Sequence, residues 1–124
     1  MKKSNLIATA TSLLALGCAG SYPPPTQQMA DVQSANRSAN ELGAQNNPNA
    51  QLHLKLAEEQ LQQAKTAMEQ DDNKSANSLL TRAKADAELA VALMRDSNAT
   101  QEAKQAVDQS NAQRSTNAEQ GAAR

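Results

Sequence analysis

The chain has 124 residues, with 12 Lys and Arg against 13 Asp and Glu, so it has room for one small domain and no basic excess with which to bind nucleic acid. Aromatic residues make up only 1 % of the sequence, and Trp and Phe are absent from it. A sheet protein draws on aromatic and β-branched side chains, whereas the Ala, Leu, Gln, Glu and Lys that dominate here are helix formers, so an all-α fold is expected.

Residues 1–17 have the layout of a secretory signal peptide. Met1-Lys2-Lys3 is a basic start, and an apolar block runs from Leu6 to Leu16. A transmembrane helix needs about 20 apolar residues, and this block is shorter. We therefore expect residues 1–17 to be removed on export, which leaves ten basic residues against the thirteen acidic ones.

The single cysteine of the chain follows directly. Gly17-Cys18 resembles the end of a bacterial lipobox, although Ala15 and Leu16 depart from its usual order. The resemblance implies that Cys18 receives a diacylglyceryl group on sulfur, becomes the mature N-terminus and is often acylated again. A lone cysteine offers no intramolecular disulfide and no zinc cluster, whereas two or three acyl chains anchor a protein stably. Because Ala19, and not Asp, comes next, we expect the outer membrane, facing the periplasm.

A short tether links the anchor to the domain. Residues 18–26 contain "GSYPPP", in which Pro23 to Pro25 favour a polyproline II spacer. The same prolines also suit the end of one segment before Thr26 caps a helix.

The helical domain is expected over residues 27–95. Its first helix is indicated by apolar residues at steps of three and four, with Asn36 on the same side, and should end near Gln45, before Asn47-Pro48. These apolar residues are Met29, Val32, Ala35, Ala39 and Leu42.

Two clearer amphipathic helices follow. One carries Leu54, Ala57, Leu61, Ala64 and Met68, with Leu52 and Leu56 expected to widen its apolar face. The other carries Ala76, Leu80, Ala83, Ala87, Ala90 and Met94. The break at Asp71-Asp72-Asn73 favours a turn and an N-cap, so the two helices form an antiparallel hairpin, or a small three-helix bundle if the first helix joins them. Pairs four residues apart decorate the outer faces: Lys55/Glu59, Arg82/Asp86 and Lys84/Glu88.

Residues 96–124 offer nothing larger than Val107 to a core. Ala99, Ala103 and Ala106 keep a weak helical stripe, and the mixed Asn, Gln, Ser and Ala from about Ser110 favour disorder. This segment is therefore expected to be weakly helical to disordered.

Residues 56–94 carry a leucine-alanine helix, a short acidic turn and the run Asp86-Ala87-Glu88-Leu89-Ala90. This pattern resembles the bacterial family of unknown function numbered 4398, whose second helix often ends in Asp-Ala-x-Leu-Ala. The turn departs from the family pattern, since Asp71-Asp72-Asn73 lacks its glycine and aromatic residue. The resemblance covers residues 27–95 and implies small helical envelope lipoproteins without an established enzymatic activity.

The search for chemical sites ends without a candidate. Asp71-Asp72-Asn73 is no EF-hand start, because Ala76 and Arg82 occupy its glycine and glutamate positions. Adjacent Glu58 and Glu59 point about 100° apart on a helix, and the lone His53 is assigned no role. We predict no catalytic residue, no cofactor and no metal, with Cys18 the one modified residue.

Two functions remain as expectations. The first is a non-enzymatic envelope lipoprotein whose helical domain binds an envelope protein or associates weakly with itself, since its seams of alanine suit helix docking. The alternative is a spacer lipoprotein of the Braun type that binds peptidoglycan, although the chain ends in Arg124 and not in lysine.

Overall fold

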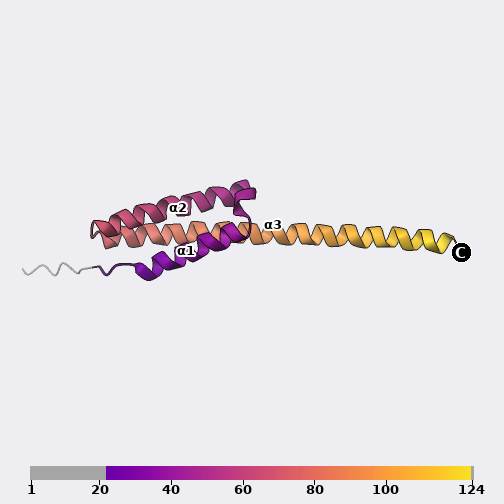
Figure 1. Ribbon diagram of the computed structural model, residues 1–124, viewed down its shortest axis with the longest axis horizontal. Coiled ribbons are helices and arrows are strands. Elements are labelled where there is room, and N and C mark those ends of the chain that lie inside the picture. The colour runs from indigo at the N-terminus through magenta and orange to yellow at the C-terminus, as the bar shows by residue number, and fades with distance from the viewer. Residues whose placement is uncertain (1–21, 124) are drawn as a thin grey trace, which may run out of the picture.

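The computed structural model describes residues 22–123. The expected signal peptide (residues 1–17) and Cys18 therefore lie outside the described residues. Helix α1 (Thr26–Glu41) is followed by a 3₁₀ turn, η1 (Ala44–Asn46), and by helices α2 (Pro48–Glu69) and α3 (Asn73–Ala122). Helices α2 and α3 form an antiparallel hairpin, and α1 lies along the first part of α3 (Figure 1). The expected all-α fold is confirmed, in its three-helix form.

Buried side chains from all three helices form the core in two clusters. One cluster lies beside η1 and contains Ala39, Ala44, Ala50, Leu54, Ala90, Val91 and Met94. The other lies toward the hairpin turn and contains Val32, Leu61, Ala64, Leu80 and Ala83. The predicted apolar stripes of α2 and α3 therefore do face each other. Alanine supplies four of the seven buried residues in the first cluster and two of the five in the second, so the core buries little apolar area per residue.

The face of α2 is narrower than the sequence suggested. Leu54 is fully buried, but Leu52 keeps 56 % of its surface exposed and Leu56 is half-buried. At 100° per residue, positions 52 and 56 lie 160° away from position 54 on either side, so they cannot share its face. The expectation that these two leucines widen the apolar face was wrong.

The connection between α1 and α2 depends on two residues with defined backbone roles. Gly43 follows α1 in the left-handed conformation (φ 88°), where a side chain would be strained. Asn47 is extended, as its position before Pro48 requires, and its side chain caps α2 by accepting from the backbone N–H of Asn49 and Ala50. Helix α1 accordingly ends at Glu41, before the expected Gln45.

At its other end α1 begins without a side-chain cap. Its N-cap position is taken by Pro25, and Thr26 is already the first helical residue. The proline carbonyl accepts the backbone N–H of Met29 instead. Thr26 therefore does not serve as the expected cap.

The hairpin turn has the predicted chemistry. Asp71 adopts a left-handed conformation (φ 58°), which aspartate tolerates better than most residues. Asp72 is the N-cap of α3 and accepts from the backbone N–H of Ser75 at 3.0 Å. Side-chain and backbone hydrogen bonds from Ser75 lower the pKa of the Asp72 carboxyl.

Helix α3 continues far beyond the bundle. It has 50 residues, about 75 Å at 1.5 Å per residue, and passes Arg95 without a break. From Ala99 to Ala123 every residue is exposed. The segment expected to be weakly helical to disordered is therefore a continuous helix, because no glycine or proline interrupts residues 73–120 and alanine and glutamine favour helix. We call residues 96–122 the α3 extension.

The two ends of the described chain lie far apart. Helix α1 begins at the end of the bundle where the hairpin turn lies, whereas the α3 extension leaves from the opposite end (Figure 1). None of the helices in residues 22–123 combines the length and the apolar character that crossing a bilayer requires.

Candidate functional site

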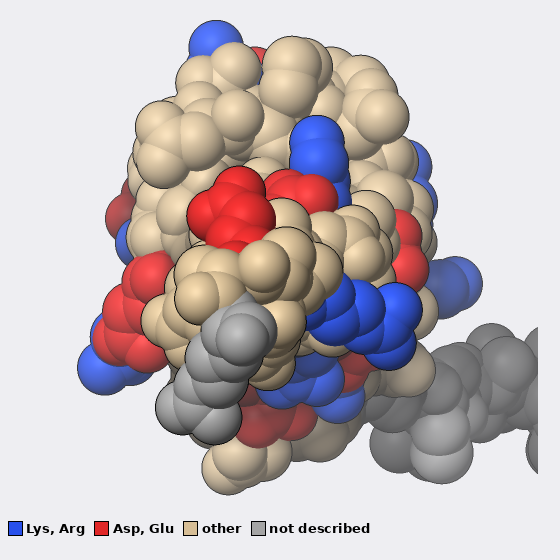
Figure 2. Space-filling model, turned by 90° about the vertical axis from the view of Figure 1, so that its right-hand side faces the viewer, with Lys and Arg blue, Asp and Glu red and all other residues tan. Residues whose placement is uncertain are grey.

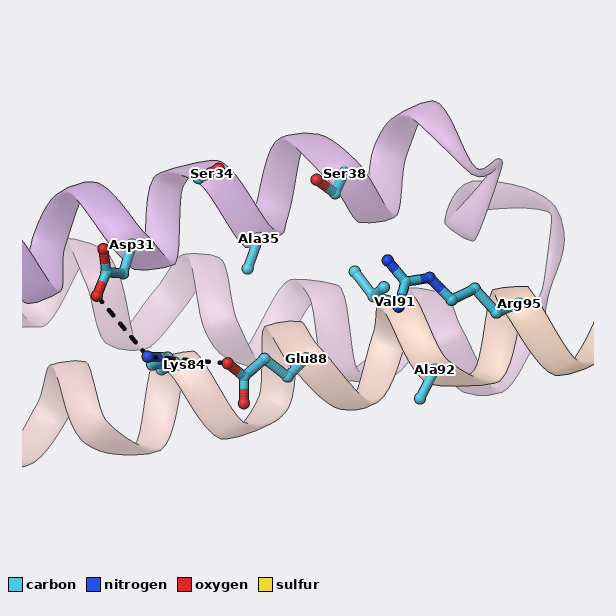
Figure 3. A pocket seen from close by; sticks show the side chains of 9 residues that line it. All are labelled: Asp31, Ser34, Ala35, Ser38, Lys84, Glu88, Val91, Ala92 and Arg95. Carbon is cyan, nitrogen blue, oxygen red and sulfur yellow. Dashed lines mark ion pairs between the residues drawn. The ribbon is translucent and has the colours of Figure 1, made fainter.

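A groove runs between α1 and α3 on the outside of the bundle. It has a volume of about 590 Å³, and its walls are lined by Asp31, Ser34, Ala35 and Ser38 of α1 and by Lys84, Glu88, Val91, Ala92 and Arg95 of α3. In Figure 3, Ala35 points from α1 toward α3, and Lys84 lies between the two helices. The groove forms because α1 packs on the hairpin through Val32, Asn36 and Ala39, which leaves the polar side of α1 facing away from the core.

Lysine 84 bridges the two walls of the groove. Its Nζ lies 3.7 Å from Asp31 Oδ2 on α1 and 3.9 Å from Glu88 Oε1 one turn along α3. The second contact confirms the expected pair four residues apart. All three side chains are more than a third exposed, so these ion pairs contribute little to stability.

Arginine 95 closes the groove at the end where the extension begins. Its guanidinium reaches back over Val91 into the groove (Figure 3). Within residues 22–123 the ion pairs join His53 to Asp86 and Lys84 to Asp31 and Glu88, so Arg95 takes part in none of them. The groove therefore offers small side chains for close approach and one cation for an acidic partner.

A second polar cluster joins α2 to α3. His53 Nδ1 lies 2.9 Å from Asp86 Oδ1, and the side-chain amide of Gln60 donates to Asp86 Oδ2 at 2.8 Å. The His53 and Asp86 side chains are 27 % and 21 % exposed. Asp86 was expected to pair with Arg82 on the surface, and this was wrong, because the hairpin turns Asp86 toward α2.

This cluster could not be read from either helix alone. A hairpin folded about Asp71 and Asp72 places Asp86 opposite about residue 57, so that His53 and Gln60 lie one turn to either side of it. Within the described residues no hydroxyl or thiol hydrogen-bonds to His53. The contacts of Asp86 with His53 and Gln60 therefore join α2 to α3.

Buried polar atoms mark the first helix as well. Asn36 lies on the apolar side of α1, as expected, and is only 8 % exposed. Its backbone carbonyl accepts from Asn40, but its side-chain oxygen finds no hydrogen-bond partner among residues 22–123. A polar side chain at such a position can fix the register of packed helices.

The other positions that the sequence analysis singled out are exposed or lie outside the described residues. Glu58 and Glu59 are exposed on α2, and Lys55 and Glu59 form no ion pair there. In residues 22–123, groups of three or more metal-ligating side chains are absent. Cys18, the predicted lipidation site, lies outside the described residues.

Charges of both signs are mixed on the face of the molecule that Figure 2 shows. Figure 2 looks at the right-hand side of Figure 1 and shows acidic and basic side chains interspersed, without a field of one sign on that face. This agrees with the near-balance of charges in the sequence.

Comparison with known proteins places the chain in a family. The model of the domain of unknown function DUF4398 matches residues 27–106, which is more than half of the chain. This protein belongs to the DUF4398 family. No curated protein and no solved structure matches it. The DUF4398 match reaches past Arg95 and so takes in the first part of the α3 extension together with the three-helix bundle.

Proposed function

We propose that this DUF4398 protein is a non-enzymatic envelope lipoprotein, anchored through Cys18 to the outer membrane and facing the periplasm, whose helical domain is an interaction module. One observation carries the interaction role: the α3 extension is a helix of 27 residues with nearly all of its surface exposed. Most helices in proteins are stabilised mainly by packing against other parts of the structure. An exposed helix with so polar a surface lacks that stabilisation. A docking partner for the extension supplies that packing.

The proposed anchor is supported by the sequence of residues 1–18. Residues 1–17 have the signal layout, and Cys18 stands at the cleavage position of a lipobox-like segment. Helix α1 begins at the end of the bundle remote from the extension (Figure 1). A lipid on Cys18 therefore leaves the extension and the groove free to meet another protein.

The spacer function remains the alternative. Helix α3 alone is about 75 Å long, and α1 begins at the end of the bundle opposite the extension (Figure 1), which suits a rod that holds two layers apart. This alternative requires that the extension bind peptidoglycan.

Fractionation of cells tests the anchor, and incubation with purified peptidoglycan tests the spacer function. The wild-type chain is expected in the outer-membrane fraction, and Cys18→Ala in the soluble fraction or as an unprocessed precursor. Purified peptidoglycan incubated with the solubilised chain should leave it in the supernatant. Sedimentation with peptidoglycan would support the spacer, and an equal distribution of wild type and Cys18→Ala would contradict the anchor.

A further inference from the structure

The three helices of the bundle are not joined equally well. Helices α2 and α3 are linked by polar side chains, because His53 and Gln60 of α2 both contact the Asp86 carboxylate of α3. Their buried apolar stripes also face each other on both sides of these contacts. The α2–α3 hairpin therefore has both an apolar seam and a polar link of its own.

Helix α1 has a much weaker polar link to this hairpin. Its side-chain hydrogen bonds stay within the helix or reach the turn that follows it: Gln27 to Asp31, Asn40 to Asn36, and Gln45 to Asn40. Within residues 22–123, the ion pair of Asp31 with Lys84 is its one salt bridge to the hairpin. This pair has an N–O distance of 3.7 Å and is more than a third exposed on both sides, so it contributes little to stability.

The surface through which α1 packs is partly polar. Val32, Asn36 and Ala39 are the buried residues of this helix, and Asn36 is 8 % exposed. The side-chain oxygens of Gln28 and Asn36 are both buried without a hydrogen-bond partner among residues 22–123. A buried oxygen of this kind has lost its hydrogen bond to water and gained none in exchange. Both oxygens regain water when α1 leaves the hairpin, which lowers the cost of its departure.

The connection after α1 is suited to act as a hinge. Gly43 lies between α1 and η1 with a φ of 88°, and glycine can change its backbone angles at little cost. The next residue, Ala44, is fully buried in the same cluster as Leu54 of α2. The turn η1 therefore stays with the hairpin when the backbone rotates at Gly43. At its other end α1 begins without a side-chain cap.

We propose that α1 is a releasable helix, which leaves the hairpin as one unit about Gly43 while α2 and α3 remain packed. Release exposes both core clusters to water, since Val32 belongs to one and Ala39 to the other. The packed state is therefore the major one, and the released state is a minor state in equilibrium with it. Such partial openings involve the elements with the fewest stabilising contacts, which here is α1.

Release changes how the α3 extension is directed, and this consequence rests on the proposed anchor at Cys18. In the packed state α1 and α3 run in the same direction, and α1 begins at the end of the bundle where the hairpin turn lies (Figure 1). The packing of α1 thus fixes the direction of the extension relative to the anchored end. After release the extension turns about Gly43 and can contact a partner from a wider range of directions. An upright spacer requires the packed state.

Hydrogen exchange of the full-length chain in detergent micelles, followed by mass spectrometry, measures the release. The protection factor is the ratio of the intrinsic to the observed exchange rate. We expect protection factors over residues 26–41 to be at least about tenfold lower than those over residues 50–64 and 76–94, because α1 exchanges from the released state and the hairpin does not. Equal protection of all three helices would overturn the proposal, since α1 would then open only when the whole bundle unfolds.

Replacing Asn36 tests whether α1 is released as a unit. Asn36→Leu removes the buried amide, so it should raise the protection factors throughout residues 26–41 about tenfold. Gln33→Leu is the matched control, because Gln33 is exposed on the same helix, and it should leave these protection factors unchanged. An Asn36→Leu effect confined to the residues next to position 36, or no effect, would overturn release as a unit.

A change within the hairpin provides an independent test. His53→Ala weakens the hairpin in the packed and released states alike, so it should lower the protection factors of α2 and α3 about fivefold and leave those of α1 unchanged. An equal fall in all three helices would show that the bundle opens only as a whole. Lipid labelling at Cys18 reports on the anchor separately, so a failed release and a failed lipoprotein give different results.

Discussion

Replacing Leu54 by alanine tests the packing of the bundle at one of its largest buried side chains. Leu54 is fully buried in the cluster beside η1. Leucine-to-alanine changes at such sites cost about 3–5 kcal/mol, because the apolar contact is lost and a cavity remains. The roughly 70 residues of the bundle have an expected stability of about 4–10 kcal/mol, so the variant loses a third or more of it.

The matched control lies two residues away on the same helix. Leu52 is 56 % exposed, and its change to alanine removes similar chemistry from the surface, at a cost of about 0.5 kcal/mol or less. Thermal melting of a soluble form starting at Ala19, followed by circular dichroism, should show the cooperative transition lowered by about 12 °C or more for Leu54→Ala and nearly unchanged for Leu52→Ala. Equal melting of the two variants would refute the assigned face of α2.

Three further predictions concern other contacts of the bundle. Leu61→Asp should abolish cooperative melting, because it places an unpaired carboxylate in the core. Glu59→Ala, on the surface, should change the free energy of unfolding by less than about 1 kcal/mol. Similar melting of the two variants would count against the assigned packing of α2 on α3. A double-mutant cycle between His53→Ala and Asp86→Asn should give a coupling of about 1 kcal/mol, and additive effects would count against this contact. Because folding lowers the pKa of Asp72, the ionised carboxylate stabilises the fold fully above the ordinary value of 3.8, and this stabilisation is lost as the pH falls through the folded pKa. Asp72→Asn should therefore reduce the loss of unfolding free energy in that acidic range. An unchanged pH dependence of stability in the variant would refute this.

The sequence was sufficient to predict the order of the three helices and the buried stripes by which α2 and α3 pack. Steps of three and four identified the stripes around Leu61 and Leu80, and the turn residues Asp71 and Asp72 located the hairpin correctly. These features are local, since they depend on helical period and on the conformational preferences of a few residues.

What the sequence missed depends on how the helices are placed against each other. The His53 and Asp86 contact spans 33 residues and exists only once the hairpin register is set. The groove requires the position of α1 on α3, which Val32 and Ala39 alone do not specify. Helix α3 is longer than expected because a polar composition does not prevent a helix, and residues 73–120 contain no glycine or proline that would break one.

Lipid labelling at Cys18 tests the central claim most directly, because the proposed localisation depends on the proposed anchor. Cells that produce the full-length wild-type chain are grown with a clickable palmitate, beside cells that produce Cys18→Ala. We predict a labelled, processed wild-type protein and an unlabelled Cys18→Ala that keeps the precursor size. Equal labelling of the two proteins, or an unlabelled wild type, would contradict the account.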